Sequence, residues 1–206
     1  MPATMPRIAA VLVALVCWAG LAIQFSATYA GTHSVAVTTW ILLRYFTVIT
    51  NFAVALCMTW FATGGRLSAR LLGGLTLAIL LVGVVYMTLL RGLVHLSGGA
   101  ELADTLLHKV SPVLMALWWL LFAPRGQLKW PVPLVWCIYP LAYFAYVLAR
   151  AHVDGKYPYP FMDAGHLGWV QTVLNAAGIA LGFIICGAVL VWIDSWRPLG
   201  SRSGRR

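Results

Sequence analysis

Six long apolar segments fill most of this 206-residue chain and leave only short connections between them. They are residues 7–29, 41–62, 71–90, 105–123, 131–151 and 168–193. As a helix, each is about long enough to cross a hydrocarbon core of roughly 30 Å. The sequence therefore predicts an all-α, polytopic membrane protein built as a bundle of six transmembrane helices.

The composition excludes an ordinary soluble domain. The chain is 62% hydrophobic and 9% charged, and its mean hydropathy is +0.88. We expect a single transmembrane domain over residues 1–199, followed by a basic, disordered cytoplasmic tail at 200–206. Arg7 and the apolar run after it are similar to a signal peptide. However, the run from Ile8 to Ile23 is longer than a usual signal-peptide core, so we interpret it as a spanning helix.

Charged residues divide into two sets that alternate along the chain. One set lies at the N-terminus, at the 63–70 and 124–130 connections and in the tail, and it has nine Lys or Arg and one acid, Asp194. The other set has five basic and four acidic residues: Arg44, Arg91, Lys109, Arg150, Lys156, Glu101, Asp104, Asp154 and Asp163. Because cationic connections stay in the cytoplasm, we expect both termini inside and residues 91–104 and 152–167 outside.

This division also explains the net charge of +9. The basicity follows the topology and attracts anionic membrane lipids to the tail. A nucleic-acid partner is not expected, because it requires a basic face on a folded domain. All five histidines fall on the outer side, so we expect any proton-transfer chemistry there. They are His33, His95, His108, His152 and His166.

Cysteines and glycines within the apolar segments are expected to serve packing. The cysteines are interpreted as buried thiols, with no disulfide, metal or cofactor. Gly178, Gly182 and Gly187 are expected to allow close helix approach. The cysteines are Cys17, Cys57, Cys137 and Cys186.

The second segment carries a polar stripe near its outer end. In a continuous helix, Arg44, Thr47 and Asn51 at i, i+3 and i+7 share one face. Polar groups in lipid normally face the interior of the bundle. Two structural interpretations are also open, since a membrane threonine often bonds a carbonyl of its own helix and Arg44 can extend to the interface.

The fourth segment carries a histidine beside a carboxylate. Asp104 and His108 are i, i+4 neighbours, so the carboxylate can fix the tautomer of the imidazole. Pro112 removes a backbone donor and predicts a kink that opens space next to His108. The structural alternative is an interfacial histidine near a helix start.

Thr47 and His108 are expected to belong to one site. Both segments enter from the outer face, so the two side chains are expected at a similar shallow depth. If the two helices are neighbours, the hydroxyl meets the imidazole. A hydroxyl next to a base is the arrangement of an activated nucleophile.

Other segments offer polar groups to support such a site. The fifth has a stripe of Tyr139, Tyr143, Tyr146 and Arg150, and the sixth has the amide pair Gln171 and Asn175. They can bind an ester carbonyl or its oxyanion, or simply link helices.

The outer loop at 152–167 is rich in proline and aromatic residues. We expect it to cover the site as a lid, with His152, Tyr159 and Phe161 as its main residues.

These motifs resemble the androgen-induced hydrolase family of membrane threonine hydrolases, which includes the androgen-dependent TFPI-regulating protein. The resemblance rests on three segments: Arg44-Tyr45-Phe46-Thr47, the His108 segment with its downstream proline, and His152 with Tyr159-Pro160-Phe161. It implies a six-helix membrane protein of the bacterial inner membrane that cleaves fatty acid esters of hydroxy fatty acids. It also implies Thr47 as nucleophile and His108 as base.

The sequence thus predicts a lipid-ester hydrolase whose substrate reaches the site from the bilayer. The alternative is a non-catalytic membrane protein that binds lipid or quinone or assists transport, which needs the polar stripe but no nucleophile. A haem protein is a third class. It normally requires two imidazoles on facing helices at matched depth, whereas only His108 lies inside an apolar segment.

Overall fold

The structure is a computed structural model that describes residues 4–196, and all regular structure in that range is helical. The all-α prediction is therefore confirmed. The tail at 200–206 lies outside the described residues. The elements are α1 (Thr4–Thr32), α2 (Val35–Leu42), α3 (Phe46–Ala62), α4 (Ala69–Val85), η1 (Tyr86–Leu90), α5 (Gly99–Thr105), η2 (Leu106–Val110), α6 (Ser111–Phe122), α7 (Val132–Asp154), η3 (Pro160–Met162) and α8 (Ala164–Ser195).

Five helices are long and apolar enough to cross a membrane, and α2 with α3 forms a sixth span if this bent pair is counted as one. These helices indicate a multi-pass membrane protein. The continuous helix expected over 41–62 is wrong, because α2 ends at Leu42, α3 begins at Phe46 and their axes differ by 99°. Arg44 consequently lies in the turn and not on a helical face with Thr47.

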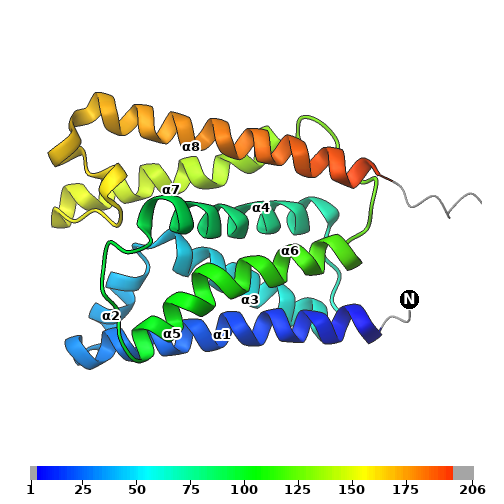
Figure 1. Ribbon diagram of the computed structural model, residues 1–206, viewed down its shortest axis with the longest axis horizontal. Coiled ribbons are helices and arrows are strands. Elements are labelled where there is room, and N and C mark those ends of the chain that lie inside the picture. The colour runs from blue at the N-terminus through cyan, green and yellow to red at the C-terminus, as the bar shows by residue number, and fades with distance from the viewer. Residues whose placement is uncertain (1–3, 197–206) are drawn as a thin grey trace, which may run out of the picture.

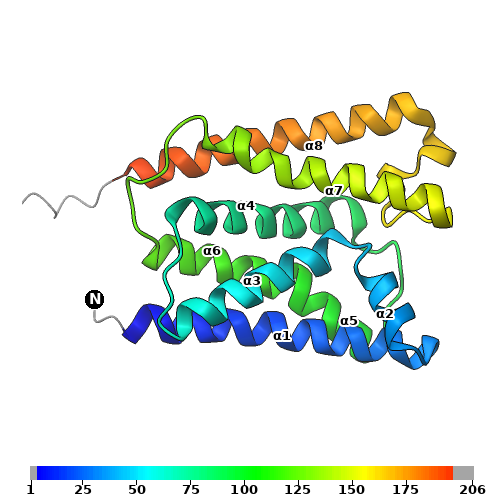
Figure 2. The ribbon, with the colours of Figure 1, turned by 180° about the vertical axis from the view of Figure 1, so that it is seen from behind.

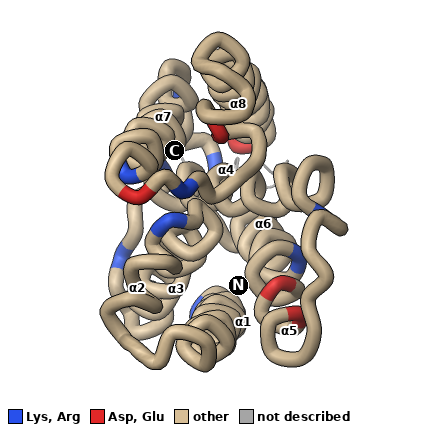
Figure 3. The backbone as a smooth tube through the Cα atoms, turned by 90° about the vertical axis from the view of Figure 1, so that its left-hand side faces the viewer, with Lys and Arg blue, Asp and Glu red and all other residues tan. Residues whose placement is uncertain are grey.

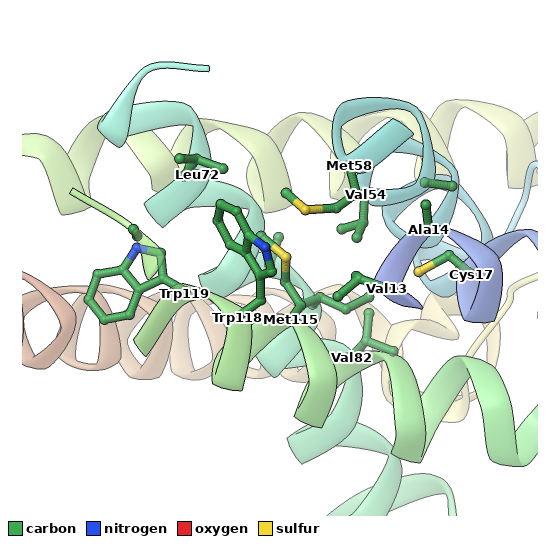
Figure 4. Packing of buried hydrophobic residues seen from close by; sticks show 14 of the residues in the cluster. Val13, Ala14, Cys17, Val54, Met58, Leu72, Val82, Met115, Trp118 and Trp119 are labelled. Atoms are coloured by element: carbon green, nitrogen blue, oxygen red, sulfur yellow. The ribbon is translucent and has the colours of Figure 1, made fainter. Parts of the chain in front are cut away.

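The helices form two layers around α4 (Figures 1 and 2). The α7–α8 pair packs on one side of α4, while α3 and α6 contact it on the other and α1 lies beyond them. Buried apolar side chains of α1, α3, α4 and α6 fill the space between these helices (Figure 4). Among them are Val13, Cys17, Val54, Met58, Leu72, Val82, Met115 and Trp118.

The 43–45 turn, the 91–98 connection and the 155–163 connection gather at one end of the bundle, which we call the site end (Figure 1). The N-terminus and the 63–68 and 123–131 connections lie at the opposite end (Figure 1). Seen from the site end, basic and acidic residues are interspersed (Figure 3).

Several local expectations need correction. The 91–104 connection is shorter than expected because α5 already begins at Gly99. A first turn begins at Ala164, since the carboxylate of Asp163 accepts hydrogen bonds from the amides of Gly165 and His166 and caps it. Gly168, where the last apolar segment was expected to begin, has non-helical backbone angles and separates this turn from the rest of α8.

The packing roles of the small residues differ from one another. A Cβ on Gly178 or Gly182 would meet nothing within 4 Å, so the expected close approach is wrong for both. Gly187 does allow one, because its Cβ would lie 2.9 Å from that of Pro133. Of the cysteines, Cys17 and Cys137 are buried and Cys57 is half-buried, whereas Cys186 is exposed.

Candidate active site

Thr47 and His108 meet at the site end. Thr47 lies in the first turn of α3 and His108 in the π-helical turn η2. The Oγ1 atom of Thr47 is 3.1 Å from Nε2 of His108. Thr47 is 5% exposed and the His108 side chain 19%. The expected approach of the two side chains is therefore confirmed, in a site that is mostly sheltered from solvent.

Asp104 determines the tautomer of His108. Nδ1 of the imidazole lies 3.1 Å from both the backbone oxygen and the carboxylate Oδ1 of Asp104. Because both partners are acceptors, Nδ1 carries the proton and donates it. Nε2 is then the unprotonated nitrogen, and it accepts a hydrogen bond from the Thr47 hydroxyl.

Tyr86 is a member of the site that the sequence did not indicate. Its ring stacks on the His108 imidazole, and its hydroxyl donates to Oδ2 of Asp104 at 2.5 Å. The Lys109 amine lies 3.7 Å from the same carboxylate oxygen. No spacing rule links Tyr86 to Asp104, because the two residues lie on different spans.

The residues around the π-helical turn η2 explain why it forms. The amide of Ser111 donates to the Leu106 carbonyl, five residues back, and Pro112 next to it has no amide hydrogen to donate. Two glycines let neighbouring helices approach this turn. A Cβ on Gly20 would lie 2.7 Å from the Leu107 side chain, and one on Gly83 would lie 3.1 Å from Pro112.

Asn51 ties the two halves of the site together. Its side-chain amide donates to the carbonyl of Thr47 at 2.9 Å and to that of Leu107 at 3.1 Å. Its Oδ1 accepts from the Ser111 hydroxyl at 2.6 Å. Asn51 is fully buried, so it acts as a positioning residue beneath the Thr47–His108 pair and does not face the substrate space.

The tyrosine stripe of α7 stabilises the bend between α2 and α3. The bend leaves carbonyls without helical donors, and the hydroxyls of Tyr143 and Tyr146 donate to those of Arg44 and Leu43, at 2.7 and 3.1 Å. Arg44 itself is buried and pairs with Asp154. The expected oxyanion role of Tyr143 and the expected supporting role of Arg44 are therefore replaced by structural ones.

The connection between α7 and α8 contributes to the site through Tyr159. Tyr159 stacks on Phe161, and Asn175 donates to the Phe161 carbonyl at 3.0 Å. Gln171 contacts Asn175 and lies on the exposed side of α8. Asn175 and Gln171 thus hold the loop and do not reach the pair. His152 lies exposed in the last turn of α7 and lines neither of the cavities described below, so its place in the lid stays a prediction.

Two cavities meet at Thr47. The first, which we call the polar cavity, has a volume of about 640 Å³ and is lined by Asp104, His108, Thr47 and Tyr159 among others. The second, which we call the apolar pocket, has a volume of about 70 Å³ and lies between α4, α7 and α8. Thr47, Tyr159 and Leu90 line both, so the two cavities adjoin at Thr47.

The start of α3 brings hydrogen-bond donors to the same junction. The amides of Val48 and Ile49 donate to the Tyr45 carbonyl, which leaves those of Phe46 and Thr47 without a backbone acceptor among the described residues. Burial raises the pKa of Tyr159, which lines both cavities at this junction.

Comparison with known proteins adds no name to this site. No family model matches the chain, and no curated protein or solved structure matches it either.

Proposed function

We propose that this chain is an integral membrane lipid-ester hydrolase with Thr47 as nucleophile and His108 as general base. The observation that carries the proposal is the continuous series of contacts from the Thr47 hydroxyl to His108 and on to Asp104. Such a series supplies a nucleophile, a base that activates it, and a third group that orients the base. The resemblance to the androgen-induced hydrolases supports the same assignment.

The reaction runs in two halves. Thr47 Oγ1 attacks the ester carbonyl carbon while Nε2 of His108 takes the hydroxyl proton. The C–O bond to the alcohol then breaks, and the alcohol oxygen leaves with the proton from His108, which leaves an acyl-threonine. Water attacks this acyl group, with His108 again taking the proton, and the carboxylic acid is released as Thr47 recovers its hydrogen.

The developing oxyanion is stabilised by donors that differ from those expected. The amides of Phe46 and Thr47, which have no backbone acceptor among the described residues, and the hydroxyl of Tyr159, which lines both cavities, are the donors that we assign to this role. Donors already aimed at this charge lower the barrier without reorganisation. The positive end of the α3 dipole adds to their effect.

The membrane orientation is part of the proposal. The distribution of basic residues favours cytoplasmic termini and an outward-facing site end, in the inner membrane of a bacterium. A membrane-impermeant maleimide added to intact cells tests it, using Gln127→Cys and Lys156→Cys in a background without native cysteines. We expect labelling at position 156 only. Labelling at 127 but not at 156 would reverse the topology.

Hydrolysis is tested on the purified protein with a panel of lipid esters and a fluorophosphonate probe. We expect wild type and Thr47→Ser to turn over and Thr47→Ala to lose activity by orders of magnitude, with probe labelling lost as well. His108→Ala should be about as slow, and the double variant no slower than either, because coupled groups act as a unit. Near wild-type activity in Thr47→Ala would refute the mechanism.

A non-catalytic lipid- or quinone-binding protein is the second candidate. One observation favours this candidate. Besides Asp104 and His108, the cavity of about 640 Å³ is lined mostly by apolar residues, and a cavity of this kind also suits ligands that are not cleaved. In that case Thr47 only packs, and its hydrogen bond is worth roughly 0.6 kcal/mol. Retained binding of a lipid or quinone by Thr47→Ala, without turnover by wild type, would favour this alternative.

A further inference from the structure

A groove on the lipid-facing side leads toward Thr47. The groove has a volume of about 410 Å³ and runs between α4 and α8, so we call it the α4–α8 groove. It shares Leu81, Val85 and Ile179 with the apolar pocket. The apolar pocket in turn shares Thr47 with the polar cavity. The three spaces therefore adjoin one another from the surface of the bundle to the nucleophile.

The walls of this route are suited to hydrocarbon. No charged residue lines the groove or the apolar pocket, whose linings contain described residues only. Along α4 and η1 the groove extends from Leu77 to Leu89, which is about 18 Å at 1.5 Å per residue. That length is more than half of a hydrocarbon core of roughly 30 Å, and it matches an extended acyl chain lying along the bundle.

The chemistry decides which part of an ester lies on which side. His108 must return its proton to the leaving alcohol, so the alcohol oxygen has to lie on the His108 side of Thr47. His108 lines the polar cavity and does not line the apolar pocket. The acyl part must then lie on the opposite side of Thr47, in the apolar pocket.

We infer that the acyl chain of the ester reaches Thr47 from the bilayer through the α4–α8 groove and occupies the groove and the apolar pocket during acylation. The alcohol part occupies the polar cavity. This inference rests on the proposed hydrolase function and adds the acyl subsite and the direction of access. After acylation, the chain on Thr47 remains in the apolar pocket, and the alcohol leaves through the polar cavity.

Two glycines of α8 provide a matched test. Gly182 lines the groove and Gly178, one turn earlier, does not. A Cβ on either meets nothing within 4 Å, so a side chain can start at both positions without a clash at its first atom. Gly182→Phe fills the groove, Gly182→Leu fills it partly, and Gly178→Phe is the control.

The measurement is kcat/KM for a butyryl and a palmitoyl ester of the same alcohol. For Gly182→Phe we expect palmitoyl hydrolysis to fall about tenfold or more, with butyryl hydrolysis within about twofold of wild type. Gly182→Leu should lie between, and Gly178→Phe should match wild type. The butyryl rate reports folding in every variant.

The outcomes distinguish a failure of the acyl subsite from a failure of the hydrolase proposal. If wild type hydrolyses neither ester, the hydrolase proposal and the acyl subsite both fail. If turnover depends on Thr47 but Gly182→Phe keeps the wild-type preference for chain length, only the acyl subsite fails. An equal loss for Gly178→Phe would also overturn it, because the effect would not be specific to the groove.

Discussion

Tyr86 stacks on the imidazole of His108, with ring centroids 4.4 Å apart and an interplanar angle of 21°. Both residues lie on π-helical turns, η1 and η2, which are contributed by different spans. The Tyr86 hydroxyl also binds the carboxylate that orients His108. One side chain thus restrains both the plane of the imidazole and the position of Asp104.

Replacing Tyr86 separates these two effects. Tyr86→Phe keeps the stacked ring but removes the hydrogen bond to Asp104, so we expect kcat/KM to fall by about tenfold, or roughly 1.4 kcal/mol. Tyr86→Leu removes both and should fall further. Ester kinetics measure the effect. Equal rates for Tyr86→Leu and wild type would exclude a positioning role.

Asp104 should matter through its charge and not through its bulk. Asp104→Asn keeps the shape but can present its amide NH₂ to Nδ1, which favours the wrong tautomer of His108, so we expect turnover to drop by about 100-fold or more. Glu101→Gln, an exposed acid on the same helix, is the control and should be neutral. A pH–rate profile on both variants tests this. A neutral Asp104→Asn would separate Asp104 from the mechanism.

Gly83 should be intolerant of a single added methyl group. A Cβ there would lie 3.1 Å from Pro112 and 3.4 Å from the His108 carbonyl, so Gly83→Ala should move α4 and Tyr86 away from the imidazole. We expect a loss of about 1–3 kcal/mol in stability, together with lower activity. Gly31→Ala on α1 meets nothing within 4 Å and serves as the control in thermal unfolding in detergent. Equal melting temperatures and activities for Gly83→Ala, the control and wild type would contradict the assigned contact.

The Arg44–Asp154 pair should be structural. The two side chains are 8% and 20% exposed, so Asp154→Asn leaves a largely buried guanidinium without its counter-charge. We expect a clear destabilisation, because the buried charge of Arg44 loses its partner. Unfolding in detergent measures the loss. If Asp154→Asn is as stable as wild type, another group must balance the charge of Arg44.

The sequence predicted the spans and the similar depth of Thr47 and His108 for a simple physical reason, whereas it left open whether their helices are neighbours. Apolar length sets where helices cross a membrane, and both residues lie near the same end of their spans. The Asp104–His108 contact also followed from local i, i+4 spacing. These features depend on residues close in sequence or on the bilayer itself, so composition and periodicity are sufficient to find them.

The features that the sequence did not indicate depend on partners far along the chain. The bend at 43–45 is stabilised by Tyr143 and Tyr146, about a hundred residues later. The Arg44–Asp154 pair spans a similar separation. Asn175 was expected beside the oxyanion and instead binds the loop. Periodicity indicates which face of a helix is polar, but it does not identify the neighbour that the face contacts.

The bend between α2 and α3 also has a mechanical consequence. Because it starts a new helix at Phe46, the Thr47 hydroxyl and the two free amides belong to the same rigid turn of backbone. In the proposed mechanism, the attacking oxygen and the donors for the developing charge therefore move together when α3 shifts or tilts, and their mutual geometry is retained. Only the alignment with His108 then has to be maintained between helices. Asn51 maintains it, because its side chain binds the carbonyls of both Thr47 and Leu107.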